Sequence, residues 1–198
     1  MSYSGRRLRA DPFTDLLFNV LLSFTLLMFL AIIFMNPIPK TGVINPKAEY
    51  IITVSWKDNN PDDIDTYVQS PTGDLVWFRG KEAGFVHLDR DDRGLLNDTI
   101  EIEGKKVQNP LNQEVVTIRA VVPGEYIVNV HYYATKTNEP IDVNVKVEKV
   151  NPQLEVIYYG TINLEKKGVE KTATRFNITQ GGNVTVSGNL YKRLVPDN

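Results

Sequence analysis

The chain has 198 residues, a formal net charge of −2 with acidic and basic residues interleaved, and no cysteine. We expect no nucleic-acid partner because there is no basic face, and disulfides and thiolate metal or redox sites are excluded. About 160 residues follow an N-terminal apolar run, which is enough for one domain with a sizeable core.

The apolar run Leu16–Met35 contains 20 residues without a charge. At about 1.5 Å per residue it reaches roughly 30 Å, the thickness of the hydrocarbon core of a bilayer. A cleaved signal peptide is the alternative, but its apolar core would be about 7 to 15 residues long and a small-residue cleavage site would follow. Asn36 and Pro37 follow instead. The sequence therefore predicts an uncleaved transmembrane helix over residues 12–36.

Basic residues flank the predicted helix unevenly. Arg6, Arg7 and Arg9 precede it, and the positive-inside bias then places the N-terminus in the cytoplasm. Residues 36–47 contain three prolines and one glycine, which indicates a semi-rigid linker. We expect a single-pass protein of a bacterial inner membrane with a cytoplasmic tail (1–11), a linker (37–47) and a periplasmic domain (48–198).

Three polar side chains share one face of the predicted helix. Asp11 and Pro12 are typical of a helix start, and Asp15, Asn19 and Ser23 follow at four-residue spacing. Polar groups that faced lipid would lack hydrogen-bond partners, so this face should meet protein or a hydrated path. Asp15 is then part of an ion path, or an interfacial carboxylate at the positive end of the helix dipole. Asn19 and Ser23, on the same face, favour the ion path over the interfacial carboxylate.

The run Pro12–Asp15 (Pro-Phe-Thr-Asp), followed by a Leu-rich span that ends in Ile-Phe-Met, resembles the single helix of the ExbD, TolR and MotB family. This resemblance implies a B-type subunit of a proton- or sodium-driven rotary motor, in which Asp15 carries the ion. Thr14, Asn19 and Ser23 would face the pore.

The same resemblance implies the partners of such a motor subunit. Two copies of the chain would lie inside a pentameric ring of a MotA/TolQ/ExbB-like polytopic membrane subunit. The external domain would transmit force to an envelope partner that the sequence does not identify. The alternative is a membrane-tethered binding module without ion transport. Neither hypothesis involves an enzyme or a bound cofactor apart from structural calcium.

The hydropathy pattern changes from helical to alternating after the linker. Tyr50, Ile52, Val54 and Trp56 share one face of a predicted strand, and turn signals such as Pro-Thr-Gly-Asp at 71–74 separate later runs. These runs cover residues 66–69, 75–78, 114–121, 125–133, 141–147, 154–163, 172–179 and 183–191. The predicted fold class is membrane-anchored all-β, with one N-terminal transmembrane helix followed by an antiparallel β-sandwich.

Residues from about 50 to 135 resemble a widespread family of bacterial extracytoplasmic β domains. The shared elements are Trp56, an Asp-x-Asp strand start at 63–65, Pro-x-Gly at 71–73 and Gly-x-Tyr at 124–126. This resemblance implies a β fold and no enzymatic activity. Nothing in the sequence is typical of the peptidoglycan-binding domain that MotB carries.

Seven aspartates form two acidic clusters near the predicted strand ends. Carboxylate oxygens at alternating positions are ligands that calcium prefers, although the sequence has no complete EF-hand pattern. The alternative is that these aspartates belong to solvated loops that discourage edge pairing. The candidate calcium ligands are Asp58, Asp62, Asp63, Asp65, Asp89, Asp91 and Asp92.

Overall fold

The N-terminal helix α1 extends over Pro12–Met35. In the computed structural model, which describes residues 11–35, 48–94, 99–102 and 104–196, Asp11 caps this helix. Its carboxylate accepts hydrogen bonds from the backbone N of Phe13 (3.1 Å) and from the hydroxyl of Thr14 (2.9 Å). Proline is favoured at the next position because its missing N–H would be unpaired there in any case. The segment Pro12–Ile32 is, by length and composition, apolar enough to cross a membrane.

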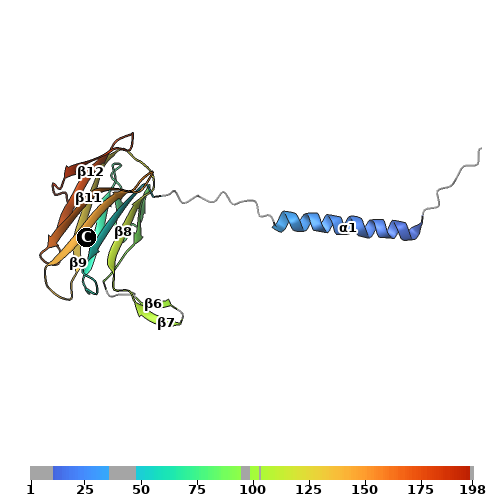
Figure 1. The fold of residues 1–198 in the computed structure, drawn as a ribbon, viewed down its shortest axis with the longest axis horizontal. Helices are drawn as coiled ribbons and strands as arrows, with labels where there is room; N and C mark the ends of the chain where they lie inside the picture. The colour runs from blue at the N-terminus through green and yellow to red at the C-terminus, as the bar shows by residue number, and fades with distance from the viewer. Residues whose placement is uncertain (1–10, 36–47, 95–98, 103, 197–198) are drawn as a thin grey trace, which may run out of the picture. The chain divides into compact units, whose positions relative to one another are not determined.

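The chain divides into two compact units, residues 1–45 and 46–198. Most of the second unit consists of two antiparallel sheets, which confirms the β class of the prediction (Figure 1). The predicted linker (37–47) and nearly all of the predicted tail (1–11) lie outside the described residues.

Both sheets place strands side by side that are distant in sequence. Sheet A contains, in spatial order, β11 (Glu155–Leu164), β10 (Ile141–Lys149), β1 (Tyr50–Trp56), β8 (Asn112–Ile118), β5 (Val86–Arg90) and β4 (Glu82–Ala83). Sheet B contains β13 (Val184–Gly188), β12 (Glu170–Ile178), β9 (Gly124–Ala134), β2 (Asp63–Gln69) and β3 (Leu75–Val76). A separate hairpin joins β6 (Thr99–Ile102) to β7 (Lys105–Gln108).

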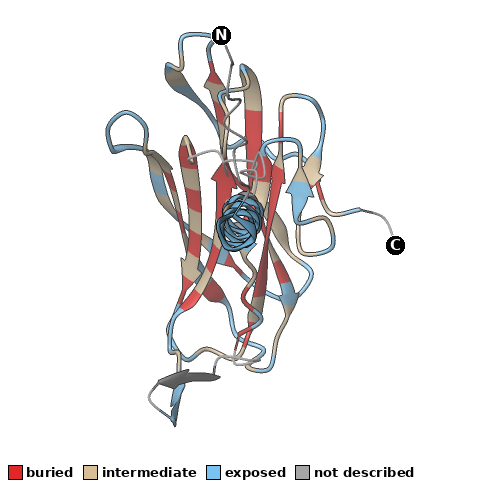
Figure 2. Cartoon of the chain, turned by 90° about the vertical axis from the view of Figure 1, so that its right-hand side faces the viewer, coloured by how far each residue is buried: buried red, intermediate tan, exposed pale blue. Residues whose placement is uncertain are grey.

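The core lies between the two sheets (Figure 2). On β1, Tyr50, Ile52, Val54 and Trp56 are all buried, as their alternation predicts. One continuous cluster joins them to inward-facing residues of sheet B, such as Phe176. At roughly 25 cal/mol per Å² of apolar surface, burial of such side chains is the main stabilising term of the domain.

The loop that joins β1 to β2 lies at the end of the domain opposite to Tyr50. The indole N–H of Trp56 donates to the carbonyl of Asp62 at 3.2 Å. The side-chain amide of Asn112 donates to the carbonyls of Lys57 (2.6 Å) and Asn60 (2.9 Å). These bonds satisfy backbone groups of a loop that has no strand partner. Because β2 begins here, the acidic residues at its start are fixed at this end of the domain.

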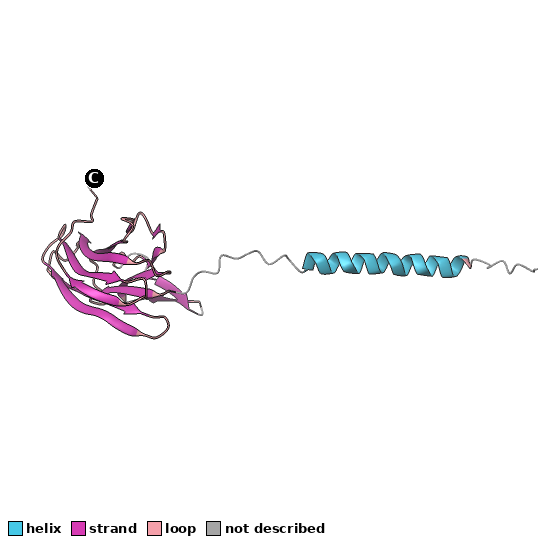
Figure 3. Ribbon diagram, turned by 90° about the horizontal axis from the view of Figure 1, so that it is seen from above, coloured by secondary structure: helices cyan, strands magenta, loops and turns pink. Residues whose placement is uncertain are grey.

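Two parts of the β domain differ from the sequence prediction. Strands β4 to β7 were not predicted, because they are short and mix charged with apolar residues, as in His-Leu-Asp-Arg at 87–90. The predicted strand over 183–191 ends at Gly188, where φ is +112°. Residues 189–196 then continue without regular structure as a C-terminal arm. Strands and loops account for the whole described part of residues 48–196 (Figure 3).

Candidate metal centre

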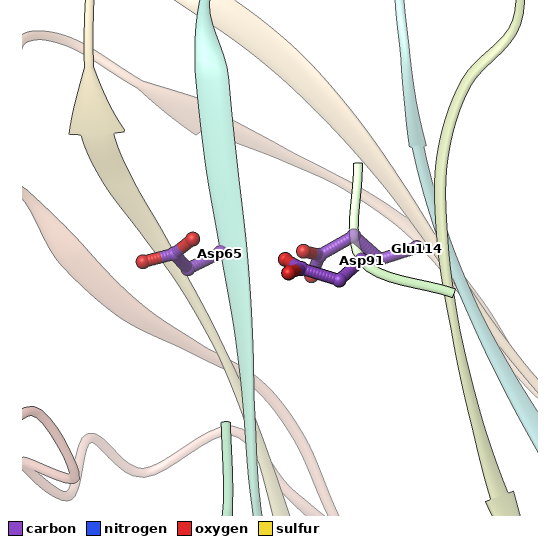
Figure 4. Close-up of side chains that lie close together, drawn as sticks. All are labelled: Asp65, Asp91 and Glu114. Carbon is purple, nitrogen blue, oxygen red and sulfur yellow. The ribbon is translucent and has the colours of Figure 1, made fainter. Parts of the chain in front are cut away.

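Three carboxylates from different parts of the β domain converge at the start of β2. Asp65 lies on β2 of sheet B, Glu114 on β8 of sheet A, and Asp91 just after β5. One oxygen of each lies within 4.8 Å of the others. Figure 4 shows the carboxylates of Asp91 and Glu114 side by side, pointing towards the strand that carries Asp65. The cluster therefore connects the two sheets.

Glu114 reaches β2 along a free edge of that strand. Strand β3 pairs with Val68 and Gln69, and within the described part of the chain no strand lies beside the preceding residues of β2 on that side. Oε2 of Glu114 accepts a hydrogen bond from the backbone N of Thr66 at 2.6 Å. The glutamate thus replaces a missing strand partner and is held in place by that bond. Its other oxygen remains available to the cluster.

The cluster is deeply buried and poorly supplied with hydrogen-bond donors. Asp65 is 3% and Glu114 is 1% exposed. Oδ2 of Asp65, Oε1 of Glu114 and Oδ1 of the adjacent Asp63 are buried without a hydrogen-bond partner among the residues that the structure describes. An uncompensated buried charge is strongly unfavourable, so these oxygens require protons or a cation.

The pKa values of the cluster follow from this environment. Burial, followed by the charges of Asp63 and Asp91, raises the pKa of Asp65 to about 8. Burial, followed by Asp91, raises the pKa of Asp63 to about 6, although Arg93 opposes the increase. Burial also raises the pKa of Glu114 well above its usual value, despite the bond from Thr66. The group therefore holds protons at a pH where isolated carboxylates are ionised.

Two basic side chains contact the cluster at Asp91. Nζ of Lys81 lies 2.9 Å from Oδ2 of Asp91, and the guanidinium of Arg93 lies 3.7 Å from the same oxygen. Both basic side chains are about half exposed, whereas the side chain of Asp91 is buried. They neutralise one carboxylate on its solvent side and leave the inner oxygens of Asp65 and Glu114 unpaired.

The other candidate calcium ligands have different environments. Asp62 accepts hydrogen bonds from Tyr132, Thr135, Lys136 and Thr137 and thereby fixes the loop between β9 and β10. These bonds saturate its carboxylate. Asp62 therefore holds the fold together at this end of the domain.

The remaining three aspartates are also separate from the cluster. Asp92 binds Arg90 and the backbone N atoms of Gly94 and Gln113. Asp89 binds Thr117 and Arg119, and Asp58 is exposed. Of the seven aspartates, the structure thus brings together Asp65 and Asp91, and the charge of Asp91 also acts on Asp63.

Glu114 is the member of the carboxylate cluster that the sequence prediction missed. It occupies an inward-facing position of β8, in line with the buried Asn112, Val116 and Ile118. A glutamate in a row of core positions is a signal for a functional or paired charge, because isolated glutamates are almost never fully buried. The alternation of β8 could therefore have revealed it.

On α1, the polar residues singled out from the sequence bond locally or are exposed. The backbone N of Asp15 donates to the carbonyl of Asp11 (3.0 Å), and Thr14 bonds the Asp11 cap. Asn19 and Ser23 line a shallow hollow on the surface of the helix. N-capping and the helix dipole account for an acidic residue in the first turn without an ion path.

No protein-family model and no curated protein matches the chain. Two solved structures are similar to it. The protein SAV2460, of unknown function, is 15% identical with a TM-score of 0.48, over 72% of this chain and 88% of that chain. A homologue of the telluride resistance protein TerD, SCO6318 from Streptomyces coelicolor A3(2), is 13% identical with a TM-score of 0.43, over the same shares. At these values the likeness assigns no function to the chain.

The prediction of an ExbD/TolR/MotB-like motor subunit is wrong. Of the two similar solved structures, one is described as a TerD homologue and the other as a protein of unknown function, and no family model or sequence relative supports the motor subunit. The start of the motif that carries the resemblance, Pro12–Asp15, also forms the capped first turn of α1, in which Asp11 accepts hydrogen bonds from Phe13 and Thr14. Ion carriage by Asp15, a pore face of Thr14, Asn19 and Ser23, and the pentameric ring are parts of that prediction and are not retained.

Proposed function

We propose that the chain is a membrane-tethered, non-catalytic binding module whose β domain takes up a divalent cation, calcium, at Asp65, Asp91 and Glu114. The observation that carries this proposal is the pair of buried, unpartnered oxygens on Asp65 and Glu114 that share one small space with Asp91. The two positive charges of a bound divalent cation would match the carboxylates of Asp65 and Glu114, while Lys81 and Arg93 lie against Asp91.

Calcium fits the donor set better than other common metal ions. The donors are hard carboxylate oxygens, and the chain has no cysteine to attract a softer metal. Calcium accepts six to eight oxygens in flexible geometry at about 2.3–2.6 Å, and carboxylates can bind it through both oxygens. Magnesium demands a nearly ideal octahedron at a shorter distance. Carboxylates that come from two sheets and a loop suit the less demanding ion.

Cation binding would connect the two sheets at this end of the domain. Asp65 belongs to sheet B, Glu114 belongs to sheet A, and Asp91 belongs to the segment after β5. A ligand that binds only the folded state stabilises it by RT ln(1 + [L]/Kd). The presence of calcium would therefore stiffen and stabilise the surface around the cluster, where a partner would be bound.

The N-terminal helix supports the tether in this proposal. It is long and apolar enough to span a bilayer, and Arg6, Arg7 and Arg9 precede it. The positive-inside bias would place the N-terminus in the cytoplasm and the β domain outside the inner membrane. Extracytoplasmic calcium modules typically bind with Kd values of about 10⁻⁴ to 10⁻³ M, and we expect an affinity in this range.

The proposal is tested with the full chain in mild detergent after treatment with a chelator. Calcium is titrated at pH 7.5 while heat release and thermal unfolding are measured, and magnesium is titrated in parallel. We expect binding and a higher Tm with calcium, and a much weaker response with magnesium.

Matched variants distinguish calcium binding at the carboxylate cluster from binding to acidic side chains elsewhere on the surface. Glu114→Gln keeps the bond to Thr66 available and removes a charge, so this variant should fold but lose the calcium response. Asp58→Asn changes an exposed aspartate outside the cluster and should behave like the parent chain. Absence of calcium binding at millimolar concentration, or an unchanged response in Glu114→Gln, would contradict the proposed site.

A further inference from the structure

The C-terminal arm, residues 189–196, lies on the outer face of sheet B and fills a site built from three strands. The face beneath it is as buried as a core, since Tyr67 is 1% and Ile127 is 3% exposed. Leu194 packs with these two residues in a small apolar cluster of its own, which Trp77 and Val195 extend. Without the arm, this apolar surface would face water.

The sheet holds the arm mainly through the backbone of the arm. Oε1 of Glu170 on β12 accepts hydrogen bonds from the backbone N of Leu194 (2.7 Å) and of Val195 (3.2 Å). The hydroxyl of Thr172 accepts one from the backbone N of Lys192 (3.0 Å), and Asn129 donates to the carbonyl of Lys192 (2.6 Å). These contacts recognise an extended segment with a leucine at one position, whichever copy of the chain supplies it.

The connection between the arm and the rest of the sheet is short and exposed. It begins at Gly188, where φ is +112°, a conformation that glycine adopts without strain. Asn189 and Leu190 follow, with Leu190 76% exposed, and neither makes a hydrogen bond to another described residue. The connection can therefore change direction without breaking a hydrogen bond between these two residues and the rest of the described chain.

The surface next to this connection is apolar and unpaired. Strand β13 is the last strand of sheet B, so one of its edges has no hydrogen-bonded neighbour among the strands that the structure describes. Val186 on this strand, Leu190 and Tyr191 are large side chains that stay about half or more exposed. Edge strands of this kind readily pair with a second chain, and the self-complementary case is a second copy related by a two-fold axis.

From these observations we propose that the arm is exchangeable: two copies dimerise by docking residues 191–195 of each on sheet B of the other, with their β13 edges adjacent. The arm makes the same contacts whether it lies on its own sheet or on that of the second copy. The equilibrium between monomer and dimer therefore depends on the local concentration of chains and on the new contacts at β13. A shared membrane raises that concentration; only this concentration argument rests on the proposed tether, and no step involves the cation.

Cysteine pairs test the exchange, because the natural chain has no cysteine to interfere. Thr172→Cys and Lys192→Cys are placed on separate, differently tagged copies that are produced together, and membranes are oxidised in the presence of a chelator. The side chain of Thr172 lies 3.0 Å from the backbone N of Lys192, so the two positions are neighbours, and the double variant below tests whether they can form a disulfide. We expect a disulfide-linked dimer that carries both tags, which requires the arm of one copy to lie on the other.

Two controls are needed to interpret the cross-linking result. A chain that carries both Thr172→Cys and Lys192→Cys should form the disulfide within one copy or between copies. This result would show that the geometry permits the disulfide. Adding Leu194→Ala to the copy with Lys192→Cys should lower the linked fraction by about tenfold, because the arm loses its apolar anchor. If the double variant links within one chain while the mixed single variants form no linked dimer, the exchange proposal is wrong.

Shortening the connection provides a second measurement. Deleting Asn189 and Leu190 prevents the arm from reaching its own sheet but leaves its docking residues unchanged. We expect this variant to be dimeric by light scattering after gel filtration, and a monomer with an undocked arm would overturn the proposal. A failure of calcium binding would leave both measurements unaffected, so the two proposals fail separately.

Discussion

Asp62 and Asp65 lie three positions apart, yet their environments shift their pKa values in opposite directions. Burial tends to raise the pKa of Asp62, but hydrogen bonds from Thr137, Lys136 and Tyr132 outweigh it and lower the pKa to about 2. Asp65 receives no comparable bonds at Oδ2, and burial raises its pKa to about 8. At the residue scale, the supply of hydrogen-bond donors decides whether a buried aspartate stays ionised and holds the fold together or has a raised pKa and an unpaired oxygen.

The raised pKa values predict how the stability of the calcium-free chain depends on pH. Asp63 and Asp65 bind protons more tightly in the folded than in the unfolded state, where the pKa of aspartate is about 3.9. Stability is then greatest below about pH 4 for these groups and is lost as the pH rises through about 6 and 8. We expect the Tm in chelator to fall between pH 5 and pH 8.5, and less so in Asp65→Asn. A Tm that rises over this interval in both chains would contradict the assignment.

In the proposed calcium site, Lys81 would compete with the cation for Asp91. Its Nζ lies 2.9 Å from Oδ2 of that residue, so calcium must displace it or bind against its charge. We expect Lys81→Met to tighten calcium binding by about three- to tenfold, measured by calorimetry in detergent. Lys105→Met, an exposed lysine of the β6–β7 hairpin, is the control and should leave the affinity unchanged. Weaker binding in Lys81→Met would show that the lysine supports the site.

We expect Asp62 to contribute to the stability of the fold and not to calcium binding. Asp62→Ala removes the acceptor that fixes Thr135, Lys136 and Thr137, so we expect a loss of about 2–4 kcal/mol in the free energy of unfolding. Denaturant titration measures it. Asp58→Ala, at an exposed position, should change stability by less than about 0.5 kcal/mol. Equal effects of the two substitutions would refute the role given to Asp62.

At the scale of elements, the free edge of β2 and the turn after β5 create the acidic cluster. Strand β3 is only two residues long, so it leaves the start of β2 accessible to Glu114. Asp92 holds the turn after β5 through the backbone N of Gly94 at 3.1 Å. The carboxylates therefore meet because one strand is short and one turn is fixed.

Gly94 tests the importance of this turn. Its φ is +66°, and a Cβ would lie 2.8 Å from the carbonyl oxygen of Pro61, so a side chain is both strained and obstructed. We expect Gly94→Ala to lower stability by about 2–4 kcal/mol and to weaken calcium binding by displacing Asp91. Gly104 has a similar φ of +76° but no atom within 4 Å of a Cβ, so Gly104→Ala should lose only about 1 kcal/mol. Equal losses of stability for Gly94→Ala and Gly104→Ala, measured by denaturant titration, would contradict the steric argument.

At the scale of the whole molecule, the helix and the β domain have separate roles in the proposed function. We expect the chain to stay in the membrane fraction after alkaline carbonate extraction, because the span lacks charge from Leu16 to Met35. Replacing α1 with an unrelated span should preserve both the membrane fraction and the calcium affinity, since no residue of α1 belongs to the cluster. Release of the parent chain by carbonate would contradict the tether.

Sequence patterns with a short period determined several features of this protein. The uncharged run of α1, its Asp-Pro start and the alternation of β1 each depend on neighbours within a few residues, so they can be read along the chain. The same local logic was insufficient for function, because Pro-Phe-Thr-Asp describes a capped helix as well as a motor motif. The sequence showed two clusters of aspartates, but it did not show which of these side chains would lie close together in the fold.

Only the tertiary structure decided the acidic cluster and the position of the arm. Glu114 is 48 residues from Thr66, and Lys192 is 63 residues from Asn129, yet each pair shares a hydrogen bond. Such contacts depend on strand order, on the length of β3 and on which backbone groups remain unpaired at an edge. These are properties of the assembled sheets, and no periodicity within a single strand encodes them.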